Sequence, residues 1–148
     1  MSFKIKSAGT WQTPKNIKVK QNGSWVNAKS AYVKSNGSWV MFYASVPSGS
    51  TEGVNFSGYG NKNTGDVYTD TATITVTGGT PPYSYLWNKI AGPTMDATYS
   101  TSGSTSFYKA SNMIGVFTST FGCLITDSTG ATCSILPVTA SIEIASGA

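Results

Sequence analysis

Hydrophobic and polar residues alternate with a period of two through most of this chain, and turn-forming residues separate the alternating runs. This period is typical of half-buried β-strands, because successive side chains of a strand point to opposite faces of a sheet. Beyond residue 53 the clearest runs are 71–77, 83–90, 105–109, 117–126 and 131–144, the last interrupted by Pro137. The pattern predicts an all-β protein.

A motif repeats every fourteen residues near the N-terminus. Its form is Lys-x-x-Gly-(Ser/Thr)-Trp, with lysines at Lys6, Lys20 and Lys34 and tryptophans at Trp11, Trp25 and Trp39. The second and third copies place Asn-Gly at 22–23 and 36–37, and the first has Ala-Gly at 8–9. Asn-Gly is the pair that a two-residue type I′ turn favours. Each copy therefore predicts a β-hairpin.

Counting outward from these turns places lysine opposite tryptophan on one face and apolar residues on the other. The apolar face holds Ile17, Val19, Val26 and Ala28 in one hairpin and Ala31, Val33, Val40 and Phe42 in the next. We expect this apolar face to be buried. The lysine–tryptophan face has two interpretations: a docking surface made of the six motif residues, since tryptophan is enriched at interfaces, or ordinary cross-strand packing with a cation–π contribution.

The third copy, Tyr-Val-Lys-Ser-Asn-Gly-Ser-Trp at 32–39, resembles repeats of bacteriophage tail and baseplate-associated proteins. The resemblance covers residues 9–43. It implies a structural role in a virion, as a tail or baseplate-associated component or a capsid decoration protein. The implied partners are other virion structural proteins, met by several copies of this chain in a symmetric assembly.

A polar stretch rich in serine and glycine, with Pro47, follows the repeat and has the composition of a linker. We expect a basic anchoring repeat at 1–45, a linker at 46–53 and a β-sandwich at 54–148. Alternation places Ile74 and Val76 on one face of their strand, and Tyr85 and Trp87 on one side of the next. These four residues are the predicted core of the sandwich.

Two segments of this second part resemble immunoglobulin-like domains of the polycystic-kidney-disease-repeat or bacterial type. They are Gly-Gly-Thr-Pro-Pro-Tyr-Ser-Tyr-Leu-Trp at 78–87, similar to the junction of the second and third strands, and Leu-Ile-Thr-Asp-Ser-Thr-Gly at 124–130, similar to the last hairpin. The resemblance covers residues 54–146. It implies an immunoglobulin-like sandwich that serves as a spacer, an adhesive tip or a surface decoration.

Composition narrows the possible functions. The chain has no histidine and no arginine, which excludes a Ser-His-Asp triad, a Cys-His pair and a histidine metal site. We therefore expect no enzymatic activity and no cofactor. Residues 1–51 hold seven lysines and no acid, whereas residues 52–148 hold three lysines and six acids, so the two parts carry +7 and −3. A segment this basic attracts an acidic protein surface, a nucleic acid or an anionic membrane.

The N-terminus lacks the apolar stretch of a secretory signal, and the sequence contains no membrane-spanning run. We expect synthesis in the host cytoplasm before assembly into a virion. Cys123 and Cys133 fall on the last two strands, where a two-residue loop at 128–129 would pair Cys133 with Leu124. A disulfide would need a bulge that corrects this register, so free thiols are favoured over a bond.

Three further sites have simpler alternatives. Asp66 and Asp70 are a weak calcium candidate, because Asp and Asn at such spacings more often organise turns. The four tryptophans and eight tyrosines could stack on sugars, or Trp87 and alternate tyrosines could simply fill the sandwich core. A carbohydrate-binding adhesion module that contacts a host surface glycan is therefore the main rival function. Lysine beside tryptophan could bind single-stranded nucleic acid, although the absence of arginine argues against it.

Overall fold

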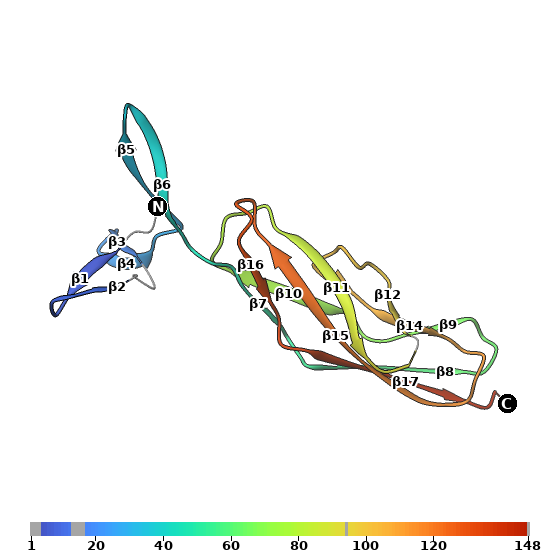
Figure 1. Cartoon of the computed structure of the whole chain (residues 1–148). Coiled ribbons are helices and arrows are strands. Elements are labelled where there is room, and N and C mark those ends of the chain that lie inside the picture. The colour runs from blue at the N-terminus through green and yellow to red at the C-terminus, as the bar shows by residue number, and fades with distance from the viewer. Residues whose placement is uncertain (1–3, 13–16, 94, 148) are drawn as a thin grey trace.

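The structure, a computed structural model, describes residues 4–12, 17–93 and 95–147. These residues form strands and no helix, which confirms the all-β prediction (Figure 1). It follows that the described ranges contain no helix of the length and hydropathy needed to cross a membrane.

The N-terminal repeat folds into three β-hairpins, each a separate two-stranded antiparallel sheet. The pairs are β1 (Ile5–Ser7) with β2 (Thr10–Gln12), β3 (Lys18–Gln21) with β4 (Ser24–Asn27), and β5 (Ser30–Ser35) with β6 (Ser38–Ala44). Both turn residues of every hairpin have positive φ, at 8–9, 22–23 and 36–37, as a type I′ turn requires. The hairpins predicted from the repeat are confirmed, including the one with Ala8 in the turn.

The predicted cross-strand register is also confirmed near the turns. Lysine lies opposite tryptophan in all three hairpins, as Lys6–Trp11, Lys20–Trp25 and Lys34–Trp39. A β-bulge ends the regular register of the third hairpin, because Ala31 lies opposite Tyr43 while Tyr32 lies opposite Met41. The alternation predicted to continue through Ala31 and Phe42 therefore stops at the bulge, where the strand carries one extra residue.

The prediction that one hairpin face is buried is wrong for the chain by itself. Val19, Val26, Val33 and Val40 are all exposed, at 37–48% of their surface. The reason is that no second layer of the described structure covers these two-stranded sheets. Among the side chains of these faces that the structure describes, Ala28 alone is buried, at the base of the second hairpin, where its amide donates to the carbonyl of Ile17. The Phe42 side chain, also predicted on this face, lies outside the described part of the chain.

The rest of the chain forms a β-sandwich of three sheets. One is β13 (Ser104–Thr105), β10 (Ala72–Thr77) and β7 (Ser48–Thr51); the second is β11 (Ser84–Ala91), β15 (Gly115–Thr126), β17 (Val138–Ala145) and β8 (Asn55–Asn61), with β16 (Thr132–Ser134) beside β15; the third is β12 (Asp96–Ala97), β14 (Phe107–Ala110) and β9 (Asp66–Tyr68). The initial segment changes sheets, since β7 runs antiparallel to β10 while β8 runs parallel to β17. The arrangement is immunoglobulin-like in style.

The sandwich begins earlier than predicted. Part of the expected linker at 46–53 is strand β7, whose residues 48–51 pair with residues 74–77 of β10. Gly49 lies so close to the core that a Cβ there would collide with the Ile125 side chain. The linker prediction failed because a strand of serine, glycine and threonine can be held by backbone hydrogen bonds without any apolar alternation.

The core is a cluster of aromatic and aliphatic side chains centred on Phe107. Its ring stacks on Phe121 at 4.1 Å between centroids and meets the edge of Trp87 at 5.6 Å. The Trp87 indole N–H donates to the carbonyl of Ser102 at 2.9 Å, so its polar atom is satisfied. Of the four predicted core residues, Trp87 and Ile74 lie in this buried cluster, and Val76 and Tyr85 are partly buried against it.

Replacing Phe107 by alanine tests this packing. Because the ring is fully buried and contacts two other aromatic rings, Phe107→Ala should lower the free energy of unfolding by about 3–5 kcal/mol, measured by urea denaturation. Leu136 is 79% exposed, and Leu136→Ala is the control, expected to change stability by less than about 0.5 kcal/mol. Equal effects of the two variants would contradict the assignment of the core.

Candidate docking surface

The lysine–tryptophan face of the hairpins is open to solvent. Trp25 is 67% and Trp39 69% exposed, and the lysines opposite them, Lys20 and Lys34, are exposed as well. Directly opposite residues have Cβ atoms roughly 4.5–5.5 Å apart, so each indole and the opposite lysine side chain leave the same face of their hairpin. Trp11 holds the same backbone register opposite Lys6, and its side chain is outside the described part of the chain.

The N-terminal repeat carries positive charge and no negative charge. Residues 1–51 contain seven lysines and no carboxylate, so no ion pair can form within the repeat. Among the side chains that the structure describes, the cation–π contact is Lys109 over Phe117 at 4.4 Å, and not a lysine–tryptophan pair of the repeat. The tryptophan faces are therefore free to meet a partner.

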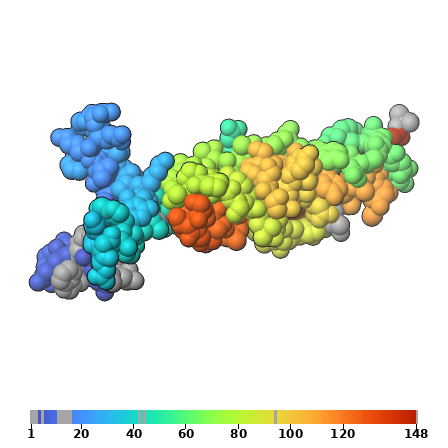
Figure 2. Space-filling model, turned by 90° about the horizontal axis from the view of Figure 1, so that it is seen from above, coloured from blue at the N-terminus to red at the C-terminus, as the bar shows by residue number. Residues whose placement is uncertain are grey.

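The hairpins and the sandwich are spatially distinct. The hairpins project from one end of the sandwich, with β5 and β6 pointing away from β1 to β4 (Figure 1). In the space-filling view they form separate lobes beside an elongated body (Figure 2). Both faces of a hairpin are consequently accessible, the lysine–tryptophan face and the valine face alike.

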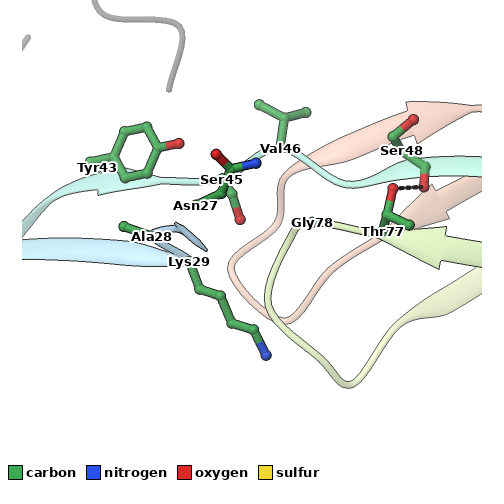
Figure 3. Close-up of a pocket in the computed structure, with 9 residues that line it drawn as sticks. All are labelled: Asn27, Ala28, Lys29, Tyr43, Ser45, Val46, Ser48, Thr77 and Gly78. Atoms are coloured by element: carbon green, nitrogen blue, oxygen red, sulfur yellow. Dashed lines mark hydrogen bonds between the residues drawn. The ribbon is translucent and has the colours of Figure 1, made fainter. Parts of the chain in front are cut away.

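A hollow of about 380 Å³ lies where the hairpins join the sandwich (Figure 3). One wall comes from the hairpin bases and the other from β7 and the end of β10, where the Thr77 hydroxyl donates to the carbonyl of Ser48 at 3.5 Å. The hydroxyl oxygen of Ser45 is buried without a hydrogen-bond partner. The lining residues are Asn27, Ala28, Lys29, Tyr43, Ser45, Val46, Ser48, Thr77 and Gly78. Sequence reasoning missed this hollow because its walls are far apart along the chain.

The structure does not gather the calcium candidates into a cation site. Asp66 lies in β9 opposite Ala110, and Asp70 follows β9 with its amide donating to the carbonyl of Ser57; both side chains are exposed. Within the described ranges, no three histidine, cysteine, aspartate or glutamate side chains come together to hold a metal ion.

Asp127 has a structural role at the turn between β15 and β16. Its carboxylate accepts hydrogen bonds from the Thr129 hydroxyl and from the amides of Thr129, Ala131 and Thr80. The Thr129 hydroxyl is the main cause of a pKa below the usual 3.8, and the three amides lower it further. A depressed pKa means that this carboxylate stabilises the fold above pH 3.8 and loses that contribution as the pH falls through the native pKa.

The two cysteines are free thiols. Cys133 lies opposite Ile125, because the turn spans more residues than the two predicted; the predicted pairing of Cys133 with Leu124 is therefore wrong. Cys123 points into the core, and its burial raises the pKa of the thiol from 9.0 to about 11. Cys133 is only partly buried.

This difference predicts unequal thiol reactivity. At pH 8 iodoacetamide should modify Cys133 at least about tenfold faster than Cys123 in the folded protein, because the buried Cys123 thiol is almost entirely protonated. In denaturant the two rates should become equal. Peptide mass spectrometry of timed samples measures both, and equal rates in the folded protein would contradict the burial of Cys123.

Comparison with known proteins gives one family match. Residues 71–92 match the model of the SprB repeat, a motif of bacterial surface and adhesion proteins. The matched segment contains β10, the turn that follows it and β11 with the core tryptophan Trp87. No curated protein is significantly similar to the chain. The shared feature is thus a part of the sandwich of this all-β chain, and the hairpin repeat lies outside it.

Proposed function

We propose that this chain is a non-catalytic attachment protein of a bacteriophage particle, in which the hairpin repeat docks on an acidic virion subunit and the sandwich stays exposed. The observation that carries the proposal is the isolation of the hairpins. Each is a separate two-stranded sheet, and the second and third hairpins are exposed on both faces, next to a sandwich that has its own core.

Binding a partner would stabilise the hairpins more than the sandwich. A single two-stranded hairpin is marginally stable in water, and the exposed valines and tryptophans are apolar surface still available for burial. Removing apolar surface from water contributes roughly 25 cal/mol per Å². Docking therefore supplies the second layer that the repeat lacks. It would bury the exposed Trp25 and Trp39, and tryptophan is a residue type that often dominates binding energy.

Charge favours an acidic partner. Seven lysines without a carboxylate make residues 1–51 a strongly basic segment, and an opposite charge on the partner speeds encounter and selects the orientation. Three similar hairpins, presented by many copies of the chain around a symmetric particle, add their weak contacts into avidity. The likeness of residues 32–39 to repeats of phage tail and baseplate-associated proteins supports a virion as the assembly.

The absence of histidine and arginine supports a role in surface contact over catalysis. Synthesis in the host cytoplasm followed by incorporation into the particle is part of the same proposal. So is the sandwich as the exposed end of the chain, where it meets the host.

A second candidate is a carbohydrate-binding adhesion module in which the sandwich acts and the repeat is a stalk. The SprB repeat match within the sandwich favours this role, since that motif occurs in bacterial surface and adhesion proteins. The first candidate places binding in the N-terminal hairpins, and the second places it in the C-terminal sandwich.

Deletion of residues 1–45 distinguishes the two candidate functions. This cut leaves β7 and every core residue of the sandwich in place. Under the docking proposal the truncated chain should fold but be missing from purified particles, as measured by mass spectrometry. Retention of the truncated chain at the full copy number would overturn docking by the repeat.

A charge reversal tests the docking surface more finely. The double variant Lys20→Glu/Lys34→Glu places acids beside Trp25 and Trp39 and should reduce the copies per particle by about tenfold or more, because like charges at an interface cost several kcal/mol. The matched control is Lys62→Glu/Lys89→Glu, two exposed lysines of the sandwich. Each pair of substitutions changes the net charge from +4 to 0, since every replacement removes one positive and adds one negative charge. Equal losses would show that net charge, and not the hairpin face, governs incorporation.

A further inference from the structure

The sheet formed by β12, β14 and β9 presents a polar and aromatic outer face. Asp96, Tyr108 and Tyr68 lie directly opposite one another across its three strands. Side chains in such a row point to the same side of a sheet. Phe107 and Val67, next to the tyrosines in sequence, point to the other side, where they belong to the core. The row is therefore the solvent face of this sheet.

The two tyrosines of this row form a platform. Their ring centroids are 5.8 Å apart and their planes are inclined by 32°. Tyr68 is 52% exposed, so much of its surface is open to solvent. The core is complete without either ring, because the buried cluster is made by side chains of the opposite face.

A hollow of about 330 Å³ adjoins the platform at Tyr108, which lines it, while Tyr68 lies beside Tyr108 and outside the lining. Ala110 lies on the outer face two residues after Tyr108 and directly opposite Asp66, and its small side chain leaves the space open. The other residues that line the hollow are Asp66, Asp96, Tyr108, Lys109, Asn112 and Met113. Its volume falls in the usual range of small-molecule sites, about 300–1,000 Å³, and its lining combines an aromatic ring with hydrogen-bonding side chains.

We propose that this hollow, hereafter the platform site, binds a neutral or amino sugar of a surface glycan. The apolar C–H face of a sugar ring packs on the electron-rich face of a tyrosine ring. Its hydroxyl groups donate to the carboxylates of Asp66 and Asp96, and the amide of Asn112 adds both a donor and an acceptor. The inference rests on the surface-contact role proposed for the sandwich and names its ligand class, whereas docking by the hairpins does not depend on it.

The charges at the platform site select against acidic sugars. Asp66, Asp96 and Lys109 line it, and Lys109 holds its ammonium group over the Phe117 ring, 4.4 Å from the ring centroid. An anionic sugar would therefore meet two like charges, which disfavours it. The strands that carry the site lie away from the proposed anchor, since β9 and β14 are toward the end of the sandwich opposite the hairpins (Figure 1).

The test begins with the full chain on an array of neutral, amino and sialylated or uronic saccharides. We expect signals from neutral or amino saccharides and none from acidic ones. The strongest neutral saccharide is then titrated by calorimetry against Tyr68→Ala and against Ala110→Gln, which fills the hollow from an exposed position. Each variant should bind at least about tenfold more weakly, a factor that corresponds to ~1.4 kcal/mol.

Tyr59→Ala is the matched control. Tyr59 is also an exposed tyrosine, at 65%, and lies on β8 of the mixed sheet, so its removal should leave the affinity unchanged. Thermal unfolding of each variant checks that the sandwich is intact, and Ala110→Gln provides a second reading should Tyr68→Ala unfold. If sugar binding persists in both Tyr68→Ala and Ala110→Gln, or is lost equally in Tyr59→Ala, the platform site is wrong while a surface-contact role survives. An array without signal would overturn both the platform site and the surface-contact role. Docking by the hairpins is tested separately, by particle incorporation.

Discussion

A two-stranded hairpin has no layer of its own to cover either face, and the N-terminal third of this chain is built from three of them. The Asn-Gly turns impose positive φ at both central residues and so set the register, which brings lysine and tryptophan together on one face and valine on the other. Neither face is covered by the described structure. The repeat is therefore well defined locally and incomplete as a folding unit, and a partner surface is what would complete it.

The sandwich, in contrast to the hairpins, has a core of its own. Phe107 stacks on Phe121 and meets Trp87, and the inward faces of β10, β15 and β17 close around them. Because this core does not involve the hairpins, the two parts can carry separate roles, an anchor at one end and an exposed surface at the other. The match of residues 71–92 to the SprB repeat falls on the sandwich, the part that we propose to remain exposed.

Sequence patterns predicted the elements that local chemistry determines. Asn22-Gly23 and Asn36-Gly37 specify their turns by themselves, and the alternation of Ile74 and Val76 needs only a period of two. Strand β8 was missed, because Gly58 and Gly60 remove the apolar alternation. A Cβ on Gly58 would collide with the backbone of Tyr68, and one on Gly60 with the Val67 side chain, so close packing against β9 requires these glycines. The platform site was also beyond prediction, since it depends on how β9, β12 and β14 align with one another. The exposure of the valine face followed from the absence of a second layer, which no local pattern encodes.

Hydrogen exchange of the backbone amides, compared between the free chain and the assembled particle, tests the central claim most directly. The account predicts that amides of residues 18–44 exchange rapidly in the free chain while those around Ile125 and Ile142 are strongly protected, because only the latter lie in a packed core. On assembly the hairpin amides should become protected and the sandwich amides should change little. Hairpins as protected as the sandwich in the free chain, or still unprotected in the particle, would contradict it.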